Sequence, residues 1–252
     1  MPQMSAPELA SAVRFEARQH IPIPLSEVVL DWSIVEGGAN KNSSVKILLV
    51  AVPYEIVTQY QEIAKLSQLH ALSLEAEVFG ILRSLGANTK GTIGLIDIGA
   101  QSTTFNIVDN GKLKATHSSD IAGNELTKIL SKSLNIKYNE AEELKKKYGI
   151  STPEMPAAKV LMPLVDLLVN EIKKVADDFF QQEGKNMERI ILAGGSALLP
   201  GLDTYLSHWF EKPVEIGNPF GGIAYPAQLQ EILQEIGPSY AIAVGMALRG
   251  FE

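Results

Sequence analysis

The chain has 252 residues, which allows one large domain or two smaller ones, and 46% of its residues are hydrophobic and 20% charged, as in ordinary folded proteins. The net charge of −7 argues against a nucleic-acid-binding surface, and the absence of cysteine excludes disulfides, thiolate metal sites and cysteine nucleophiles. Because the four histidines lie far apart and no apolar run approaches the roughly 18 residues of a membrane span, we expect neither a zinc site nor a transmembrane helix.

The N-terminal third of the sequence shows the pattern of a small α+β unit. Ser5 and Glu8 have the spacing of a capping box, which predicts a helix at the start of the chain. Two β-rich runs, residues 28–35 and 45–52, flank a segment rich in glycine and asparagine, which favours an antiparallel turn. A helix over residues 54–66, a short strand over residues 70–74 and a second helix around Val78, Leu82 and Leu85 are predicted to follow.

A polar break at residues 86–90 is the best candidate for a boundary between two parts of the chain. After it, an almost continuous apolar run over residues 92–99 predicts a buried strand. Two more strands, over residues 103–108 and 112–118, are separated by an Asp-Asn-Gly turn, so the three strands together predict a β-meander.

The rest of the chain alternates predicted helices with short strands. The longest helix carries Pro163 in its interior, where a proline should kink it, and its apolar stripe is best explained by packing into a core. The predicted helices cover residues 124–134, 139–147, 155–182, 202–209, 228–236 and 239–248, and the strands cover residues 189–193 and 214–216.

The turn after the first strand of the meander is the first candidate binding site. Gly99 permits a tight bend, so that the following amides can point at one spot, and the hydroxyls of Ser102 and Thr103 add donors that suit phosphate oxygens. Asp97, at the end of the strand, can then reach a magnesium ion through water. Together with Gln101 these residues form the predicted phosphate site; an ordinary hairpin turn with an Asx contact is the alternative.

A strand that ends in Gly194, Gly195 and Ser196 is the second candidate. Glycines at such a point allow a flat ligand to approach the backbone, and the N-terminus of the helix predicted to follow adds a favourable field for an anion. Leu198 lies in the same segment and joins the predicted nucleotide-binding residues. The alternative is a plain turn between strand and helix, with Ser196 as the helix cap.

Glu142 and Lys145 share one face of a predicted helix and are the third candidate. A carboxylate and an ammonium group at this spacing can hold ribose hydroxyls and the edge of an adenine. Two alternatives remain open: a capping pair formed by Asn139 and Glu142, and a solvated salt bridge between Glu142 and Lys145.

The order of these motifs resembles a known superfamily. A phosphate hairpin, a helix that opens with Gly123, a Glu-x-x-Lys pair and a strand that ends in Gly-Gly-Ser follow one another as in the second half of the actin, chaperone and sugar-kinase ATPases, which adds Gly123 to the predicted nucleotide site. With the flanking segments included, nearly the whole chain resembles the PilM family, the cytoplasmic actin-like proteins of type IV pilus assembly. The segments that carry this resemblance are residues 8–17, 20–24, 27–31, 48–53, 73–79 and 240–249.

The resemblance implies a fold, a cofactor and a partner. The fold class is α/β, an actin-like ATPase fold of the FtsA/PilM type, and the cofactor is ATP or ADP with magnesium. The partner is the N-terminal cytoplasmic tail of PilN, a pilus membrane protein, with other platform or motor proteins, so that a cytoplasmic chain is held at the inner membrane without direct insertion. The implied subdomains are IC over residues 1–70, IA over residues 71–90 and 238–252, IIA over residues 91–124 and 186–237, and IIB over residues 125–185.

The sequence departs from the family pattern at its start. The pattern begins with a first hairpin of IA, which carries another Asp-x-Gly phosphate loop, and with the first strands of IC. Neither precedes Met1, so we expect either a shortened chain or a protein whose missing half is supplied by another chain. With one phosphate loop, the chain is expected to bind ATP weakly and to be at most a weak ATPase. Glu77 lies in the connecting helix where the superfamily places residues near the attacking water, and a solvent-facing glutamate is the alternative.

Two other functions are compatible with the superfamily. An FtsA-like filament protein of cell division would end in an amphipathic membrane-targeting helix, whereas this sequence ends in Gly-Phe-Glu. A sugar or acid kinase would carry a catalytic aspartate and a substrate domain ahead of the phosphate hairpin. The expected function is therefore nucleotide-modulated docking of the PilN tail, by a protein that is not a turnover enzyme.

Overall fold

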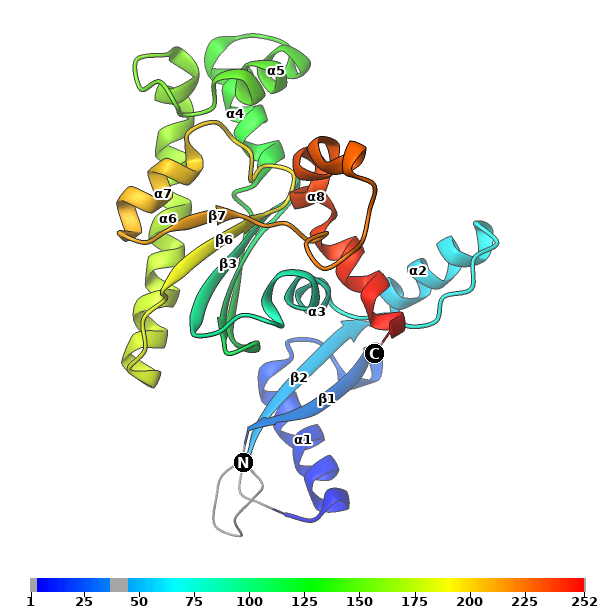
Figure 1. The fold of residues 1–252 in the computed structure, drawn as a ribbon. Coiled ribbons are helices and arrows are strands. Elements are labelled where there is room, and N and C mark those ends of the chain that lie inside the picture. The colour runs from blue at the N-terminus through cyan, green and yellow to red at the C-terminus, as the bar shows by residue number, and fades with distance from the viewer. Residues whose placement is uncertain (1–3, 37–44, 252) are drawn as a thin grey trace. The chain divides into compact units, whose positions relative to one another are not determined.

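The computed structural model describes residues 4–36 and 45–251, which form two compact units divided between Ala76 and Glu77 (Figure 1). The division between these units does not fall at the polar break of residues 86–90, so a boundary there stays a prediction for a subdivision inside the second unit. That segment lies inside the second unit, where the helical stretch before it packs against the C-terminal helix of the same unit. No helix in the part of the chain that the structure describes has the length and apolar character needed to cross a membrane.

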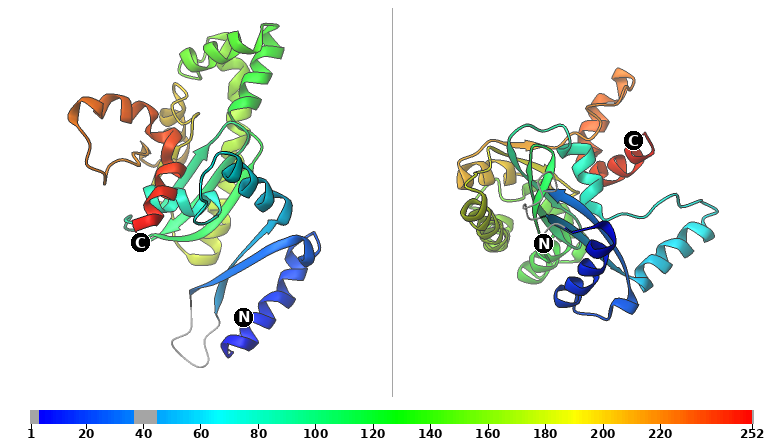
Figure 2. Two further views of the ribbon diagram at one scale, coloured as in Figure 1. Left: turned by 90° about the vertical axis from the view of Figure 1, so that its right-hand side faces the viewer. Right: turned by 90° about the horizontal axis from the view of Figure 1, so that it is seen from below.

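The first unit consists of a two-stranded sheet and two longer helices. Helix α1 (Ala6–His20) begins with the predicted capping box, in which the amide and hydroxyl of Ser5 donate to Glu8 at 2.9 and 2.7 Å. Its apolar stripe of Leu9, Val13 and Ala17 is buried, and the helix lies alongside the two strands (Figure 2). A single 3₁₀ turn, η1 (Leu25–Glu27), leads into the sheet.

Strands β1 (Val28–Glu36) and β2 (Lys46–Pro53) pair in antiparallel register, as predicted. The turn predicted between them lies outside the described residues. Helix α2 (Tyr54–Leu66) has the predicted bounds. The strand predicted over residues 70–74 is wrong, because this stretch is neither strand nor helix and pairs with none of the described strands, and Leu72 is 88% exposed.

The second unit is built on a five-stranded sheet in the order β5-β4-β3-β6-β7. The predicted meander is confirmed: β3 (Thr92–Ile98), β4 (Thr103–Asp109) and β5 (Lys112–Ser119) are antiparallel neighbours. Strands β6 (Arg189–Ala193) and β7 (Val214–Ile216) continue the sheet in parallel to β3. The carboxyl ends of β3 and β6 therefore meet at the same edge of the sheet.

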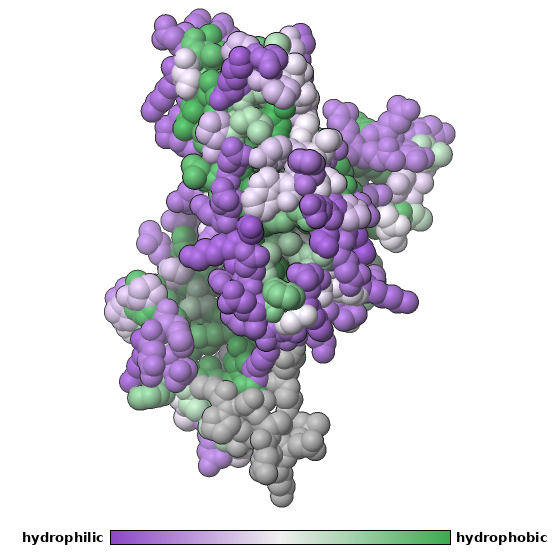
Figure 3. Space-filling view, turned by 90° about the vertical axis from the view of Figure 1, so that its left-hand side faces the viewer, coloured by the Kyte–Doolittle hydropathy of each residue, from purple (hydrophilic) through white to green (hydrophobic). Residues whose placement is uncertain are grey.

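Helices cover both faces of this sheet (Figures 1 and 2). On one face, a large core joins Ile96, Phe105 and Leu192 of the strands to apolar side chains of the helices that follow β5 and β6. These helices are α4 (Gly123–Leu134), α5 (Tyr138–Tyr148), α6 (Pro156–Glu183) and α7 (Leu202–Phe210). Figure 3 views the side that carries α6 and α7, where hydrophilic residues cover much of the surface and shield this core.

The other face carries a smaller core of Ile93, Leu95 and Val108 from the strands with Ile81 and Ala241 from the helices. The helical elements here are α3 (Glu77–Ile81), which continues into the π-helical turn η2 (Leu82–Gly86), and α8 (Gln230–Leu248). Short 3₁₀ turns, η3 (Ala227–Leu229) and η4 (Arg249–Phe251), flank α8.

Two prolines lie inside helices without ending them. The two helices predicted over residues 228–236 and 239–248 are one helix, α8, which runs through Pro238. Pro238 is buried, as is Ala241 on the same side, so packing against the sheet offsets the hydrogen bond that the proline cannot make. Helix α6 likewise includes Pro163, and a kink there stays a prediction.

Candidate functional site

The predicted phosphate turn closes between β3 and β4. The amide of Gly99 donates to the carbonyl of Ser102 at 3.0 Å. The hydroxyl of Thr103 is buried and donates to Ile121 at 2.7 Å, so it fixes the turn instead of facing a ligand. Ser102 is half-buried and Gln101 is exposed.

This turn is fastened to the start of α4. The amide of Gly123 donates to the carbonyl of Gly99 at 3.0 Å, and the amide of Asn124 donates to the carbonyl of Ala100 at 2.8 Å. Two of the amides that a helix N-terminus leaves without intrahelical partners are thus used to hold the hairpin. These two bonds join the hairpin to α4.

The second predicted motif lies beside Asp97, at the ends of β3 and β6. Gly194 has φ +88°, and a Cβ atom at this position would lie under 3.0 Å from Asp97 Oδ1 and from the carbonyl of Ile98. The amide of Ser196 donates to that same carbonyl at 3.0 Å. On its other side, the amide of Gly194 donates to Pro238 of α8 at 2.8 Å.

The helix predicted over residues 202–209 is confirmed as α7, so its N-terminus lies several residues beyond these glycines. Residues 194–201 form turns, α7 starts at Leu202, and its N-cap is Gly201. The field of that helix is therefore not directed at Gly195, and Ser196 does not cap it. Leu198 is 46% exposed on these turns.

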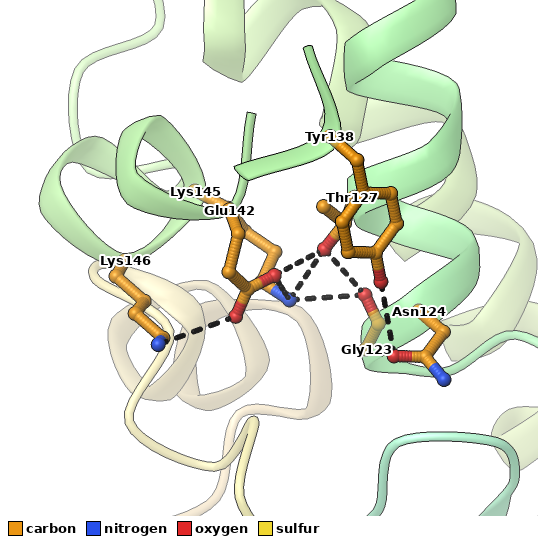
Figure 4. A network of polar contacts seen from close by, with 7 residues as sticks. All are labelled: Gly123, Asn124, Thr127, Tyr138, Glu142, Lys145 and Lys146. Atoms are coloured by element: carbon orange, nitrogen blue, oxygen red, sulfur yellow. Dashed lines mark hydrogen bonds and ion pairs between the residues drawn. The ribbon is translucent and has the colours of Figure 1, made fainter. Parts of the chain in front are cut away.

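The third motif forms a buried network with the first turn of α4 (Figure 4). The ammonium group of Lys145 lies 2.7 Å from Glu142 Oε2, and it donates to the carbonyl of Gly123 at 2.9 Å and to Thr127 Oγ1 at 2.8 Å. These three acceptors use all three of its hydrogens. The side chain of Lys145 is only 7% exposed, so it holds α5 against α4 and has no donor left for a ligand.

The carboxylate of Glu142 has one inner and one outer oxygen. Burial by itself raises its pKa, but the hydrogen bonds from Lys145 and Thr127 and the charges of two lysines hold the pKa below the usual value. Oε2 faces the network, whereas Oε1 is paired, among the residues that the structure describes, with the exposed Lys146 ammonium at 3.6 Å. Glu142 is thus ionised at neutral pH, with one oxygen placed to accept from a ligand hydroxyl.

Neither alternative for this motif describes it. The N-cap of α5 is Lys137, whose backbone amide donates to the side chain of Glu140 at 3.3 Å. Asn139 and Glu142 are therefore not the capping pair. The pair of Glu142 and Lys145 is buried on the lysine side instead of solvated.

Gly123 is the point where the three motifs meet. A Cβ atom added there would lie 2.5 Å from Ser196 Oγ, 3.2 Å from the carbonyl of Gly99 and 3.6 Å from Lys145 Nζ. The predicted site residues thus converge around one glycine, where a larger residue would have to displace the Ser196 hydroxyl. Gln101 and Leu198 remain at the surface of this region.

Two residues of the site carry no motif in the sequence. Thr127 is fully buried, and its hydroxyl bridges α4 and α5. Ser239 of α8 is exposed, and its hydroxyl lies 3.6 Å from the position that a Cβ on Gly195 would take. The sequence offers one signal for Thr127: it lies four residues after Gly123, and therefore on the same face of the predicted helix.

The surroundings of Asp97 disfavour its charged form. Burial, and then the negative charge of Glu77 at the exposed start of α3, raise the pKa of Asp97 to about 6. Among residues 4–36 and 45–251, no three metal-ligating side chains gather around it or elsewhere.

A pH dependence of stability follows from Asp97. Because its pKa is higher in the folded protein than its ordinary 3.8, its stabilising contribution is complete below pH of about 4 and is lost as pH rises through about 6. The free energy of unfolding of Asp97→Asn, relative to that of the parent, should therefore rise by about 2 kcal/mol from pH 4 to pH 7.5, as measured by urea unfolding. Glu77→Gln should move the midpoint of this change to lower pH. A stability difference that is constant with pH would contradict the assignment.

Comparison with known proteins gives the same architecture. The family model described as type IV pilus assembly protein PilM matches residues 2–251. The structure of a PilM-PilN type IV pilus biogenesis complex is 29% identical, with a TM-score of 0.88 over 100% of this chain and 75% of that chain. MreB 5 of Spiroplasma citri bound to AMPPNP is 16% identical with a TM-score of 0.57, over 78% of this chain and 64% of that chain, which confirms the actin-like fold.

Cell-division proteins are more distant relatives. FtsA of Enterococcus faecalis is 28% identical over 185 residues, which are 58% of this chain and 41% of FtsA. The chain thus matches about two fifths of the length of this FtsA. The PilM family model, in contrast, matches nearly all residues of the chain. The chain belongs to the family of type IV pilus assembly proteins PilM.

Proposed function

We propose that this chain is a nucleotide-responsive adaptor of the type IV pilus inner-membrane platform, which docks the N-terminal tail of a PilN-like membrane protein. The observation that carries the proposal is the similarity of the whole chain to the PilM of a PilM-PilN complex. We place the chain at the inner face of the membrane through this partner and through other platform or motor proteins.

The site around Gly123 suits ATP or ADP. Glu142 presents one ionised oxygen that can accept from the ribose, and Gly194 and Gly195 offer backbone without a side chain where β6 ends. Ser239 adds a hydroxyl beside Gly195. The nucleotide would supply a rigid, charged link between the phosphate hairpin and α5.

Magnesium fits this site as an ion carried by the nucleotide. Asp97 is one carboxylate, so an ion beside it would take its other ligands from phosphate oxygens and water. Its pKa of about 6 leaves it ionised at neutral pH, when it can hold such a water. Magnesium would neutralise phosphate charge, and this chain's residues would bind and orient the nucleotide.

We further propose that binding, not turnover, is the function. Glu77, the candidate for orienting a water, is an exposed side chain at the first position of α3. We retain the subdomains that the resemblance implies: residues 91–124 and 186–237, which contain the five-stranded sheet, as IIA, and residues 125–185 as IIB. We retain residues 1–70 as IC and residues 71–90 and 238–252 as IA.

The test is a titration of a fluorescent peptide, the N-terminal tail of a PilN-like protein, with and without ATP and magnesium. We expect the tail to bind and its affinity to change at least about fivefold with ATP, the lower end of ordinary coupling between sites. Glu142→Gln should require about tenfold more ATP for the same change, because it weakens a charged hydrogen bond. Glu143→Gln, an exposed neighbour on α5, should behave like the parent.

Each result bears on one part of the proposal. A tail that does not bind under either condition would refute the adaptor function. A tail that binds with an affinity independent of ATP would leave a docking protein without nucleotide control. Equal effects of the two glutamate variants would place the nucleotide elsewhere.

A further inference from the structure

Two acceptors compete for the single hydroxyl hydrogen of Thr127. Its Oγ1 lies 2.9 Å from the carbonyl of Gly123, accepts from Lys145 at 2.8 Å and is in hydrogen-bond contact with Glu142 Oε2. A threonine hydroxyl has one hydrogen. At any moment it therefore donates either to Gly123 or to Glu142, and Lys145 occupies one of its lone pairs (Figure 4).

The Gly123 acceptor is joined directly to the phosphate hairpin. Its carbonyl and the amide of Asn124 belong to the same peptide group, and that amide donates to Ala100 at 2.8 Å. A hydrogen bond accepted by a carbonyl polarises its peptide group and strengthens the bond that the amide donates. The position of the Thr127 hydrogen thus affects how firmly the hairpin is held.

The Glu142 acceptor is joined to the outer side of the site. Its second oxygen, Oε1, has Lys146 at 3.6 Å, and Lys146 is exposed. A ligand hydroxyl that donates to Oε1 withdraws charge from the carboxylate, so Oε2 becomes a weaker acceptor for Thr127. The hydrogen then shifts toward Gly123.

We propose that Thr127 is a positioning residue that couples the ribose side of the site to its phosphate side, a role that rests on the nucleotide binding proposed above. A ligand hydroxyl at Glu142 moves the Thr127 hydrogen to the Gly123 carbonyl, which tightens the bond between Asn124 and the phosphate hairpin. Thr127 is fully buried and contacts the ligand in neither state. Adenosine and the phosphate chain therefore bind cooperatively.

The test measures this coupling with the two halves of the ligand, adenosine and tripolyphosphate. In the parent protein, saturating adenosine should raise the affinity for tripolyphosphate about fivefold. Thr127→Ser keeps the hydroxyl and should keep this factor, whereas the nearly isosteric Thr127→Val should reduce it to one. Coupling that persists in Thr127→Val, or that is absent from the parent when both probes bind, overturns the role of Thr127. A parent that binds neither probe refutes the nucleotide site itself.

A second measurement needs no ligand. Amide hydrogen exchange of Asn124 should be about tenfold faster in Thr127→Val than in Thr127→Ser, while amides within β6 stay the same. If the valine variant does not fold, Glu142→Gln serves instead. Its neutral side chain competes less for the Thr127 hydrogen, so exchange of the Asn124 amide should slow although Glu142 does not touch that amide. Unchanged exchange at Asn124 in these variants overturns the proposal.

Discussion

Replacing Gly245 with alanine is expected to destabilise the second unit by about 3 kcal/mol, the upper end of the usual cost of overpacking. Gly245 lies on α8 where this helix crosses α3, and an added Cβ would overlap the carbonyl of Gly80. The obstacle is backbone, which cannot turn aside as a flexible side chain can. The two helices would therefore have to move apart.

Moving α3 and α8 apart also loosens specific hydrogen bonds. The hydroxyl of Ser84 donates to Ala241 at 2.8 Å, and Arg83 Nη1 donates to Gly245 at 2.9 Å. These bonds fasten α8 to the helical segment that carries the π-helical turn η2. Their loss explains why the expected cost lies at the upper end of the range.

The measurement must report the second unit alone. The chain has two tryptophans, Trp32 in the first unit and Trp209 in the second, so Trp32→Phe leaves Trp209 as the fluorescent probe in urea unfolding. Gly222→Ala is the matched control, because an added Cβ there meets nothing within 4 Å. A loss of less than about 1 kcal/mol in Gly245→Ala would show that the crossing can relax.

Most of the secondary structure could be predicted because each element carries its own local signal. The capping box at Ser5 marks the start of α1, and the continuous apolar run of β3 marks a strand buried on both faces. The predictions that were wrong depend on tertiary contacts. Residues 70–74 were predicted as a short strand but have no partner among the described strands. Helix α8 continues through Pro238 because the buried side of the helix packs on the sheet.

Site residues that follow the ends of strands could be predicted from the sequence, whereas the roles of residues between packed helices could not. Asp97 and Gly194 end neighbouring parallel strands, so their proximity follows from the topology. Lys145 was predicted to contact a ligand, but three acceptors bury its ammonium group, which only the packing of α5 on α4 reveals. Thr127 and Ser239 became visible only through distances between elements.

Gly194→Ala is the second change with a large expected effect, and it should impair both stability and nucleotide binding. A non-glycine residue at φ +88° is strained by about 1–2 kcal/mol, and the added Cβ would lie under 3.0 Å from Asp97 Oδ1 and the carbonyl of Ile98. We expect a total loss of about 3 kcal/mol in urea unfolding and at least about a hundredfold loss of ATP affinity in calorimetry.

Two control variants separate the causes. Gly184→Ala, at φ +66° with nothing within 4 Å of the added Cβ, reports the backbone strain alone and should cost about 1 kcal/mol without affecting ATP. Gly195→Ala meets only Ser239 Oγ at an ordinary 3.6 Å, so the fold should tolerate it. Because its methyl group would stand where the nucleotide is proposed to approach the backbone, ATP affinity should still fall. Undiminished ATP binding in both Gly194→Ala and Gly195→Ala would exclude the end of β6 from the nucleotide site.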